Sequence, residues 1–224
     1  NADDFCPQNR VFAGEQASGA HLVVGLEVRN VSIRGGGRID GRGPAFFAVP
    51  AGAPDRFVVP GWRPGQMIFL CECENVRIEG VELFNAPYWT CFLHGCERVF
   101  VRGVRVWNDW RTVNGDGIDV DCCRQVVISD CLIECGDDAI TLRGNVEPLK
   151  RPRPCEDVVV TNWRSKALLV VRGNGDGTFG SAQDLPAGLN PGHLLAGDVT
   201  GDGRADLVTA DTGVPTSALI LGRA

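Results

Sequence analysis

Two acidic clusters lie close together in one short stretch of the chain, residues 114–144. The first is the run DGIDVD from Asp116 to Asp121, and the second is the pair Asp137 and Asp138, which begins 21 residues after Asp116. Carboxyl groups a few ångströms apart can divide acid–base work, because like charges keep one of them protonated while another stays ionised and activates water. That division suits the hydrolysis of a glycosidic bond. It requires that an interval of 21 residues bring the clusters side by side.

A repeat that surrounds these acids indicates how they could be brought together. The pattern of cysteine, two polar residues, valine, any residue and a β-branched residue recurs from Cys73, Cys96, Cys123 and Cys155, at spacings of 23, 27 and 32 residues. Repeats of this length form solenoids, in which short strands of successive rungs pair about 4.8 Å apart. A Greek-key sandwich also uses short strands but does not require this register. We therefore expect an all-β fold that begins with an incomplete right-handed parallel β-helix.

The register of the repeat predicts which side chains stack. Trp89 and Asp116 both lie seven residues before a repeat cysteine, and the segments that begin at Asp116 and Asp138 match each other. We expect Trp89, Asp116 and Asp138 on three successive rungs, with Asp137 adjacent, around one exterior groove. The acids could instead be turn residues, since Asp and Gly are common in turns.

The sequence NGDGID at residues 114–119, followed by GDD at 136–138, resembles glycoside hydrolase family 28, the polygalacturonase-like enzymes. Members carry N-T-D and G-D-D at this separation on a right-handed parallel β-helix. The resemblance covers about residues 25–163 and includes the segments 31–43, 63–71 and 85–89. It implies a polysaccharide substrate of the pectic type and inverting hydrolysis without a catalytic cofactor.

The resemblance also implies a role for each matched residue. Asp138 would be the general acid, and Asp116 and Asp137 would share the role of base towards water. Asn114 would orient Asp116, and Trp89 would line the sugar groove. Trp89 could equally be a core residue, because tryptophan is common in cores as well as in sugar sites.

Some parts of the family pattern are not found in this chain. Gly115 stands where members have Thr, and the G-H-G and R-I-K rungs expected after Asp138 are missing, since the histidines are His21, His94 and His193. We therefore expect a truncated hydrolase of weak or no activity. The alternative is a non-catalytic extracellular carbohydrate-binding or surface module, or a fusion of two gene fragments.

The C-terminal part of the chain has a different pattern. All ten cysteines lie between Cys6 and Cys155, which places a boundary near residues 163–166 and predicts two domains, 1–165 and 166–224. Residues 168–222 resemble one FG-GAP/VCBS repeat, which implies a single β-propeller-like blade. Its loop 198–206 has the spacing of a Ca²⁺ site. The expected ligands of this structural Ca²⁺ are Asp198, the Thr200 hydroxyl, Asp202, the Arg204 carbonyl and Asp206.

Composition limits the partners of the chain. The net charge is −6 and no block of Lys or Arg occurs, so nucleic acid is not an expected partner. No apolar run reaches the 18 residues typical of a membrane span. The chain begins at Asn1 without a visible signal peptide, and we expect an extracellular or cell-surface location. An open solenoid end would expose backbone and core, so self-association is a further expectation. The repeat cysteines are expected to be buried small side chains, with a disulfide as the alternative.

Overall fold

The computed structural model describes residues 6–7, 19–59, 61–146, 149–162, 167–171, 183–186, 191–197, 200, 206–211 and 217–220. Regular structure in these ranges is β, apart from the short 3-10 helix η2 (Gly43–Phe46). A short antiparallel pair, β1 (Cys6–Pro7) and β2 (Ala20–His21), precedes the main body. No helix in the described part of the chain has the length and apolar character needed to cross a membrane.

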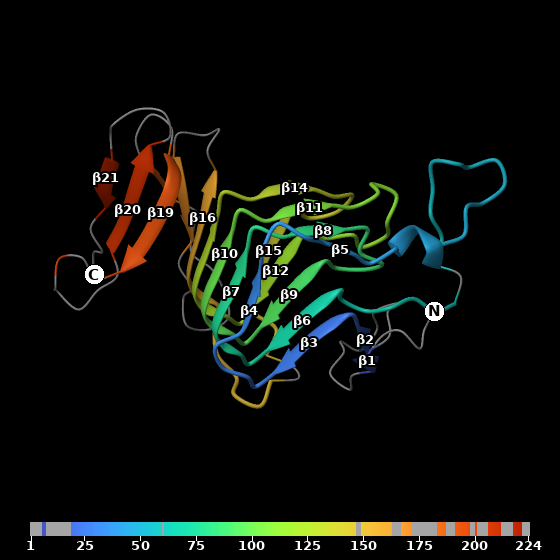
Figure 1. The fold of residues 1–224 in the computed structure, drawn as a ribbon, viewed down its shortest axis with the longest axis horizontal. Helices are drawn as coiled ribbons and strands as arrows, with labels where there is room; N and C mark the ends of the chain where they lie inside the picture. The colour runs from blue at the N-terminus through green and yellow to red at the C-terminus, as the bar shows by residue number, and fades with distance from the viewer. Residues whose placement is uncertain are drawn as a thin grey trace.

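The main body is built from three sheets of parallel strands that the chain visits in turn (Figure 1). The first sheet contains β3 (Val23–Leu26), β6 (Ile68–Cys71), β9 (Cys91–His94), β12 (Ile118–Asp121) and β15 (Ile140–Arg143). The second contains β4 (Ser32–Arg34), β7 (Glu74–Glu79), β10 (Glu97–Arg102), β13 (Arg124–Ser129) and β16 (Glu156–Asn162). The third contains β5 (Arg38–Asp40), β8 (Glu82–Phe84), β11 (Arg105–Trp107) and β14 (Leu132–Glu134). This arrangement confirms the predicted parallel β-helix.

Side chains alternate between inward and outward positions along each strand, and the inward ones form the core. In the first sheet, Ile68, Cys91, Ile118 and Ile140 are paired in register and point into one continuous apolar stack. In the second sheet, the repeat valines Val76, Val99, Val126 and Val158 form the equivalent inward column. Burial of β-branched side chains between the sheets is the main stabilising contribution of such a solenoid.

The repeat cysteine forms a hydrogen bond to the backbone at the turn between the first and second sheets. Each thiol donates to a carbonyl of the preceding rung: Cys96 to Leu70 (3.2 Å) and Cys123 to Leu93 (3.3 Å). Every cysteine whose side chain is described is free, and burial raises the pKa of Cys96 far above its ordinary value. These thiols are therefore buried core groups that satisfy strand-end carbonyls, as the simpler interpretation predicted.

The two polar residues of the repeat mark a bend in the backbone. The second of them has positive φ in every rung: Asn75 (55°), Arg98 (56°), Gln125 (55°) and Asp157 (53°). This left-handed conformation is unfavourable for most side chains and common for Asn and Asp. The repeat thus records a recurrent bend as well as an inward-facing pattern.

The C-terminal segment continues the second sheet. β17 (Ala167–Val171) pairs antiparallel with β16, and β18 (Gln183–Pro186) pairs with β17. A separate antiparallel sheet contains β19 (Pro191–Gly197), β20 (Asp206–Asp211) and β21 (Ser217–Ile220). The predicted boundary at 165/166 falls outside the described residues, but the strands on either side of it are hydrogen-bonded to each other.

An apolar patch on the outer face of the second sheet explains where the C-terminal segment packs. One outward column changes from Arg77 and Phe100 to Val127 and Val159 along the solenoid. Val127 and Val159 are 6% and 7% exposed, and β19 contacts β13 and β16, the strands that carry them. The β19–β21 sheet therefore covers the apolar end of this face, while its polar end stays open.

Candidate active site

The backbone register brings the predicted site positions into one stack. Trp89, Asp116 and Asp138 each lie two residues before paired residues of β9, β12 and β15. Thr90 N donates to Asp116 O (2.9 Å), and Gly117 N donates to Asp138 O (2.9 Å). The three residues thus occupy equivalent places on successive rungs, at the turn between the third and first sheets, as the spacing predicted.

The carboxyl groups of Asp116, Asp137 and Asp138 converge at this turn. Each has an oxygen within 4.8 Å of the others. Asp116 is 7% exposed, whereas Asp137 and Asp138 are exposed. Burial, followed by the charges of Asp137 and Asp138, raises the pKa of Asp116 from 3.8 to about 7, although Arg143 acts in the opposite direction. The trio therefore contains one carboxyl group that exchanges its proton near neutral pH.

A close backbone contact shapes the turn that carries Asp137 and Asp138. A Cβ added at Gly136 would lie 2.1 Å from the carbonyl oxygen of Trp110. A Cβ at Gly117 would likewise meet the Ala139 carbonyl oxygen at 2.4 Å. The glycines of both motifs are thus required by close packing between neighbouring turns.

Asn108 positions the turn before Asp116, and sequence reasoning missed it. Its side chain is buried, accepts a hydrogen bond from Ala86 N (2.9 Å) and donates to Thr90 Oγ1 (2.7 Å) and Gly115 O (3.1 Å). Thr90 Oγ1 in turn donates to Asp116 O (2.7 Å). The available signal was the position of Asn108 immediately after β11, one rung after Asn85.

Arg63 holds the other side of this turn. Its buried guanidinium lies over Tyr88 (4.5 Å) and donates to Pro87 O (3.3 Å), to Val113 O and to Asn114 Oδ1 (2.8 Å). Asn114 was expected to orient Asp116. The structure places its side-chain oxygen on Arg63, and its role towards Asp116 stays a prediction.

Trp89 packs inside the wall of the site. Its side chain is 3% exposed, stacks on Tyr88 (4.9 Å) and lies under the guanidinium of Arg143 (4.6 Å). The interpretation of Trp89 as a core residue therefore fits its ring better than a place in the lining of the sugar groove, since neighbouring side chains cover it.

A groove of about 620 Å³ opens beside the exposed acids. Its lining includes Asp137, Glu134 and two exposed tryptophans, Trp107 (41%) and Trp110 (65%). Asp109 also lines it and is paired with Arg111 (2.6 Å). Exposed aromatic faces beside carboxyl groups are suited to stacking on sugar rings. Trp107 and Trp110 are therefore better placed than Trp89 for this role.

A second set of polar groups is buried next to the trio. Asp119 and Asp121 are both fully buried, and burial is the main cause that raises the pKa of each. Asp121 accepts from Asn145 N (2.8 Å), and the Asn145 carbonyl contacts His94 Nε2 (2.9 Å). Possible metal-ligand atoms of His94, Asp121 and Cys122 lie within 4.8 Å of one another. The backbone of Asn145 already contacts two of these side chains, Asp121 and His94.

The predicted Ca²⁺ loop lies almost entirely outside the described residues. Thr200 and the backbone of Asp206, the first residue of β20, are described, whereas Asp198, Asp202 and Arg204 are not. The ligand set consequently stays a prediction from the sequence.

Comparisons with known proteins agree with this architecture. Residues 8–150 match the family profile of the glycosyl hydrolases family 28, and residues 155–209 match that of the FG-GAP-like repeat. The chain therefore belongs to glycosyl hydrolases family 28. The second match confirms the two-part organisation, and it begins one residue before β16, the last parallel strand.

The similar proteins include several polygalacturonases. Polygalacturonase QRT2 of Arabidopsis thaliana is 28% identical over 130 residues, which are 58% of this chain and 29% of that protein. An exopolygalacturonase of Zea mays is 26% identical over 119 residues, 52% of this chain and 28% of that protein. This chain thus spans less than a third of the length of these relatives. The polygalacturonase of Erwinia carotovora has the same fold, with a TM-score of 0.55 and 17% identity over 71% of this chain and 44% of that one.

Proposed function

We propose that this chain hydrolyses glycosidic bonds of a pectic polysaccharide with inversion, through Asp116, Asp137 and Asp138. The observation that carries this proposal is the convergence of the three carboxyl groups, one of which, Asp137, lines a groove with exposed tryptophans. Membership of the family and the names of the similar proteins support the substrate class.

The proposed roles are those that the resemblance to the family implies. Asp138 is the general acid towards the leaving oxygen, and Asp116 and Asp137 position and deprotonate water. Asp116 has a pKa of about 7, so its role as base requires either neutral to alkaline pH or transfer of its proton within the trio when substrate binds. Asn108 and Thr90 hold the backbone of Asp116, and Arg63 and Asn114 hold the preceding turn.

We expect turnover to be slow. No Arg-x-Lys pair follows Asp138 at the family's distance, and the groove beside the acids is lined by carboxyl groups, which repel a uronate.

The test is release of reducing ends from polygalacturonate by the wild type and by Asp138→Asn, with Asp130→Asn as a control on a different turn. Activity should fall at least a hundredfold in Asp138→Asn and stay within twofold in the control. Proton NMR of the first product anomer distinguishes inversion from retention. Release that is absent in the wild type, or equal in the wild type and Asp138→Asn, would sink the proposal.

A non-catalytic carbohydrate-binding module is the second candidate, favoured by the exposure of Trp107 and Trp110. It predicts oligosaccharide binding that Trp110→Ala weakens, without bond cleavage by the wild type. We further propose that the FG-GAP-like segment is a propeller-type unit with a structural Ca²⁺, and that the protein acts outside the cell or at its surface. The two matched profiles and the loop 198–206 support these proposals.

A further inference from the structure

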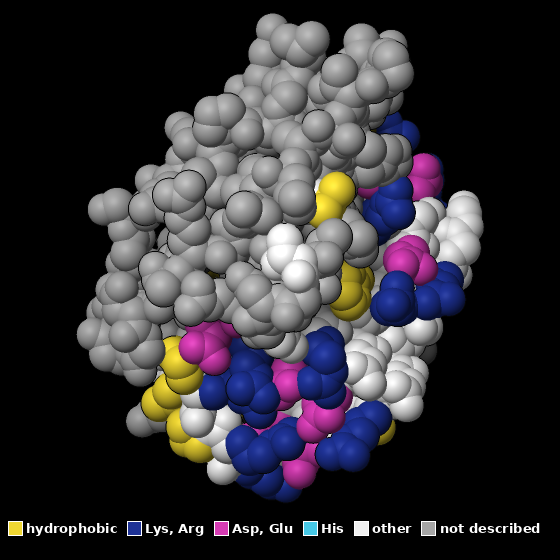
Figure 2. Space-filling model, turned by 90° about the vertical axis from the view of Figure 1, so that its left-hand side faces the viewer, with side chains coloured by type: hydrophobic (Ala, Val, Ile, Leu, Met, Phe, Trp, Pro, Cys, Tyr) yellow, Lys and Arg dark blue, Asp and Glu magenta, His cyan; other side chains and the backbone are white. Residues whose placement is uncertain are grey.

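Arginines are concentrated on one face of this acidic chain. Figure 2 shows basic side chains gathered on one side of the molecule with acidic side chains between them. At the edge of the second sheet, two glutamates, Glu74 and Glu97, are surrounded by ion-pairing arginines: Arg29, Arg98, Arg124, Arg151 and Arg153. Partial burial raises the pKa of Glu97, but hydrogen bonding and charge from Arg124 and its neighbours lower it overall. The surroundings of these carboxylates are therefore strongly positive.

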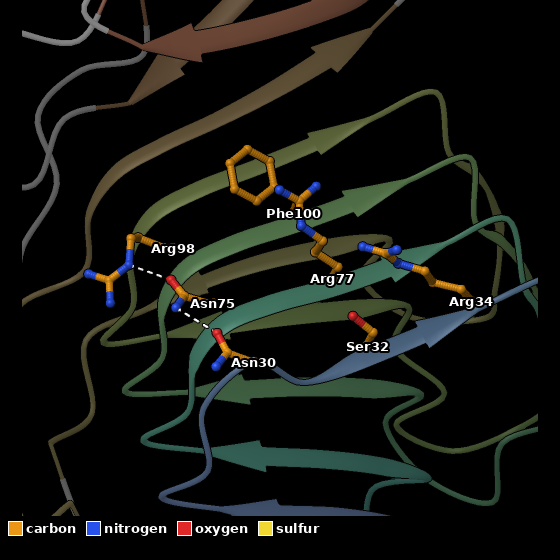
Figure 3. Close-up of a pocket in the computed structure, with 7 residues that line it drawn as sticks. All are labelled: Asn30, Ser32, Arg34, Asn75, Arg77, Arg98 and Phe100. Carbon is orange, nitrogen blue, oxygen red and sulfur yellow. Dashed lines mark hydrogen bonds between the residues drawn. The ribbon is translucent and has the colours of Figure 1, made fainter.

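A groove of about 440 Å³ extends from this edge over the outer face of β4, β7 and β10 (Figure 3). Its lining is Asn30, Ser32, Arg34, Asn75, Arg77, Arg98 and Phe100, without a carboxylate. At one end, Asn30 Oδ1 accepts from Asn75 Nδ2 (3.0 Å), and Asn75 Oδ1 accepts from Arg98 Nε (2.6 Å). This ladder fixes the side chains of three neighbouring rungs.

The centre of the groove carries an excess of positive charge. Arg34 (3.0 Å) and Arg77 (3.5 Å) both pair with Glu79, which leaves two guanidinium groups for one carboxylate. Arg77 also lies over the ring of Phe100 (5.0 Å), and the side chains of Arg34 and Arg77 are 52% and 49% exposed. Guanidinium groups present paired donors that match a carboxylate. Stacking on Phe100 already orders the side chain of Arg77, so Arg77 loses less conformational entropy when it binds a ligand.

A repeated anion fits this face better than a small one. Each exposed arginine–carboxylate contact contributes only a few tenths of a kcal/mol to about 1 kcal/mol, since water and salt screen it. The arginines recur on adjacent rungs, so a polymer with a carboxylate on each unit engages several at once and gains by effective concentration.

We infer that this groove binds a carboxylate-bearing polysaccharide, a polyuronate chain, outside the acidic trio. The choice of polysaccharide over other polyanions rests on the proposed function. The groove lies on the second sheet, whereas the trio lies at the turn between the third and first sheets. The chain thus holds the charged polymer on its arginine face, while the acidic groove receives the segment that is cleaved.

The experiment measures binding of the full chain to polygalacturonate by affinity electrophoresis and calorimetry, with fully methyl-esterified polymer as the neutral ligand. The test variant is the double substitution Arg34→Ala and Arg77→Ala. The matched control is Arg38→Ala with Arg105→Ala, because these two arginines share Glu82 on the third sheet and Arg38 lies over Phe84 (3.8 Å). The control removes the same charge and the same kind of stacked pair elsewhere.

We expect binding to weaken at least tenfold in the test variant and less than twofold in the control, with no binding of the esterified polymer. Equal loss of binding in both variants would show an effect of net charge. Equal binding of the esterified polymer would show that the groove does not recognise carboxylates. Tighter binding of single-stranded DNA than of polygalacturonate would assign the face to another polyanion. Each of these outcomes overturns the inference. Cleavage of a short oligomer is measured in parallel, so loss of the proposed hydrolysis and loss of this binding are distinguished.

Discussion

Asp116 and Asp138 occupy equivalent positions on successive rungs, joined by the hydrogen bond from Gly117 N to Asp138 O (2.9 Å). Asp116 is nevertheless buried and Asp138 exposed. Two carboxyl groups at equivalent positions of neighbouring rungs thus have different solvent environments, and burial holds a proton on Asp116 up to about pH 7. In the proposed roles, Asp116 must therefore release this proton before it can act as the base.

The raised pKa of Asp116 predicts a pH-dependent stability. The folded state binds the proton more tightly than the unfolded state, so stability falls as pH rises from about 4 to about 7 and stays low above that. Asp116→Asn imitates the protonated form. At pH 8 we expect the variant to gain up to about 4 kcal/mol relative to wild type, and at pH 4 to differ little.

Urea denaturation at both pH values measures this difference, with the exposed Asp55→Asn as control. Because Asp119 has its pKa raised in the same direction, wild type and variant are compared at each pH rather than by slope alone. An unchanged difference between pH 4 and pH 8 would contradict the raised pKa of Asp116.

Gly136→Ala should displace the turn that carries Asp137 and Asp138. Its Cβ would lie 2.1 Å from the Trp110 carbonyl oxygen, so one of the two turns must move. We expect a loss of about 1–3 kcal/mol in the free energy of unfolding and a fall in hydrolysis larger than the unfolded fraction explains. Gly36→Ala, which has no atom within 4 Å of its added Cβ, is the control. Equal stability of the two variants would show that the turn tolerates the contact.

The rungs of the solenoid could be predicted from the sequence because each contributes the same strand at nearly the same interval. Parallel pairing then fixes which residues stack on successive rungs, and the stacking of Trp89, Asp116 and Asp138 follows from that register. The cysteine ladder follows from the same repeat, and the two-part organisation follows from the point where the repeat ends.

The corners between the sheets could not be predicted in this way. They differ in length from rung to rung, and their contacts join residues far apart in sequence, such as Arg63 with Asn114. The partners that bury Trp89 and the hydrogen bonds of Asn108 therefore became visible only in three dimensions. The antiparallel pairing of β17 with β16 was equally hidden, because the repeat pattern ends there.

Calcium should stabilise the C-terminal segment. The loop 198–206 supplies three carboxylates at positions 1, 5 and 9, which favours Ca²⁺ once the segment is folded. Ca²⁺ at a hundredfold excess over its Kd should add about 2.7 kcal/mol and raise the Tm of the full chain. Asp202→Asn should remove most of this shift, and Mg²⁺ should not reproduce it. An identical Tm in millimolar Ca²⁺ and in chelator would count against the site.

The hydrogen bond from Asn108 to Thr90 should couple the third-sheet corner to the backbone of Asp116. Asn108→Ala leaves buried partners at Thr90, Gly115 and Ala86 without their hydrogen bonds, and we expect a loss of about 2–4 kcal/mol in the free energy of unfolding. Thr90→Val keeps the shape of the side chain and removes both of its hydrogen bonds, at a cost of about 1–2 kcal/mol. The double variant loses the hydrogen bond between Asn108 and Thr90 only once. The losses of the two single variants should therefore sum to at least 0.5 kcal/mol more than the loss measured for the double variant, roughly the smallest coupling expected of residues in contact. Strict additivity would mean that Asn108 stabilises the corner without acting on Asp116 through Thr90.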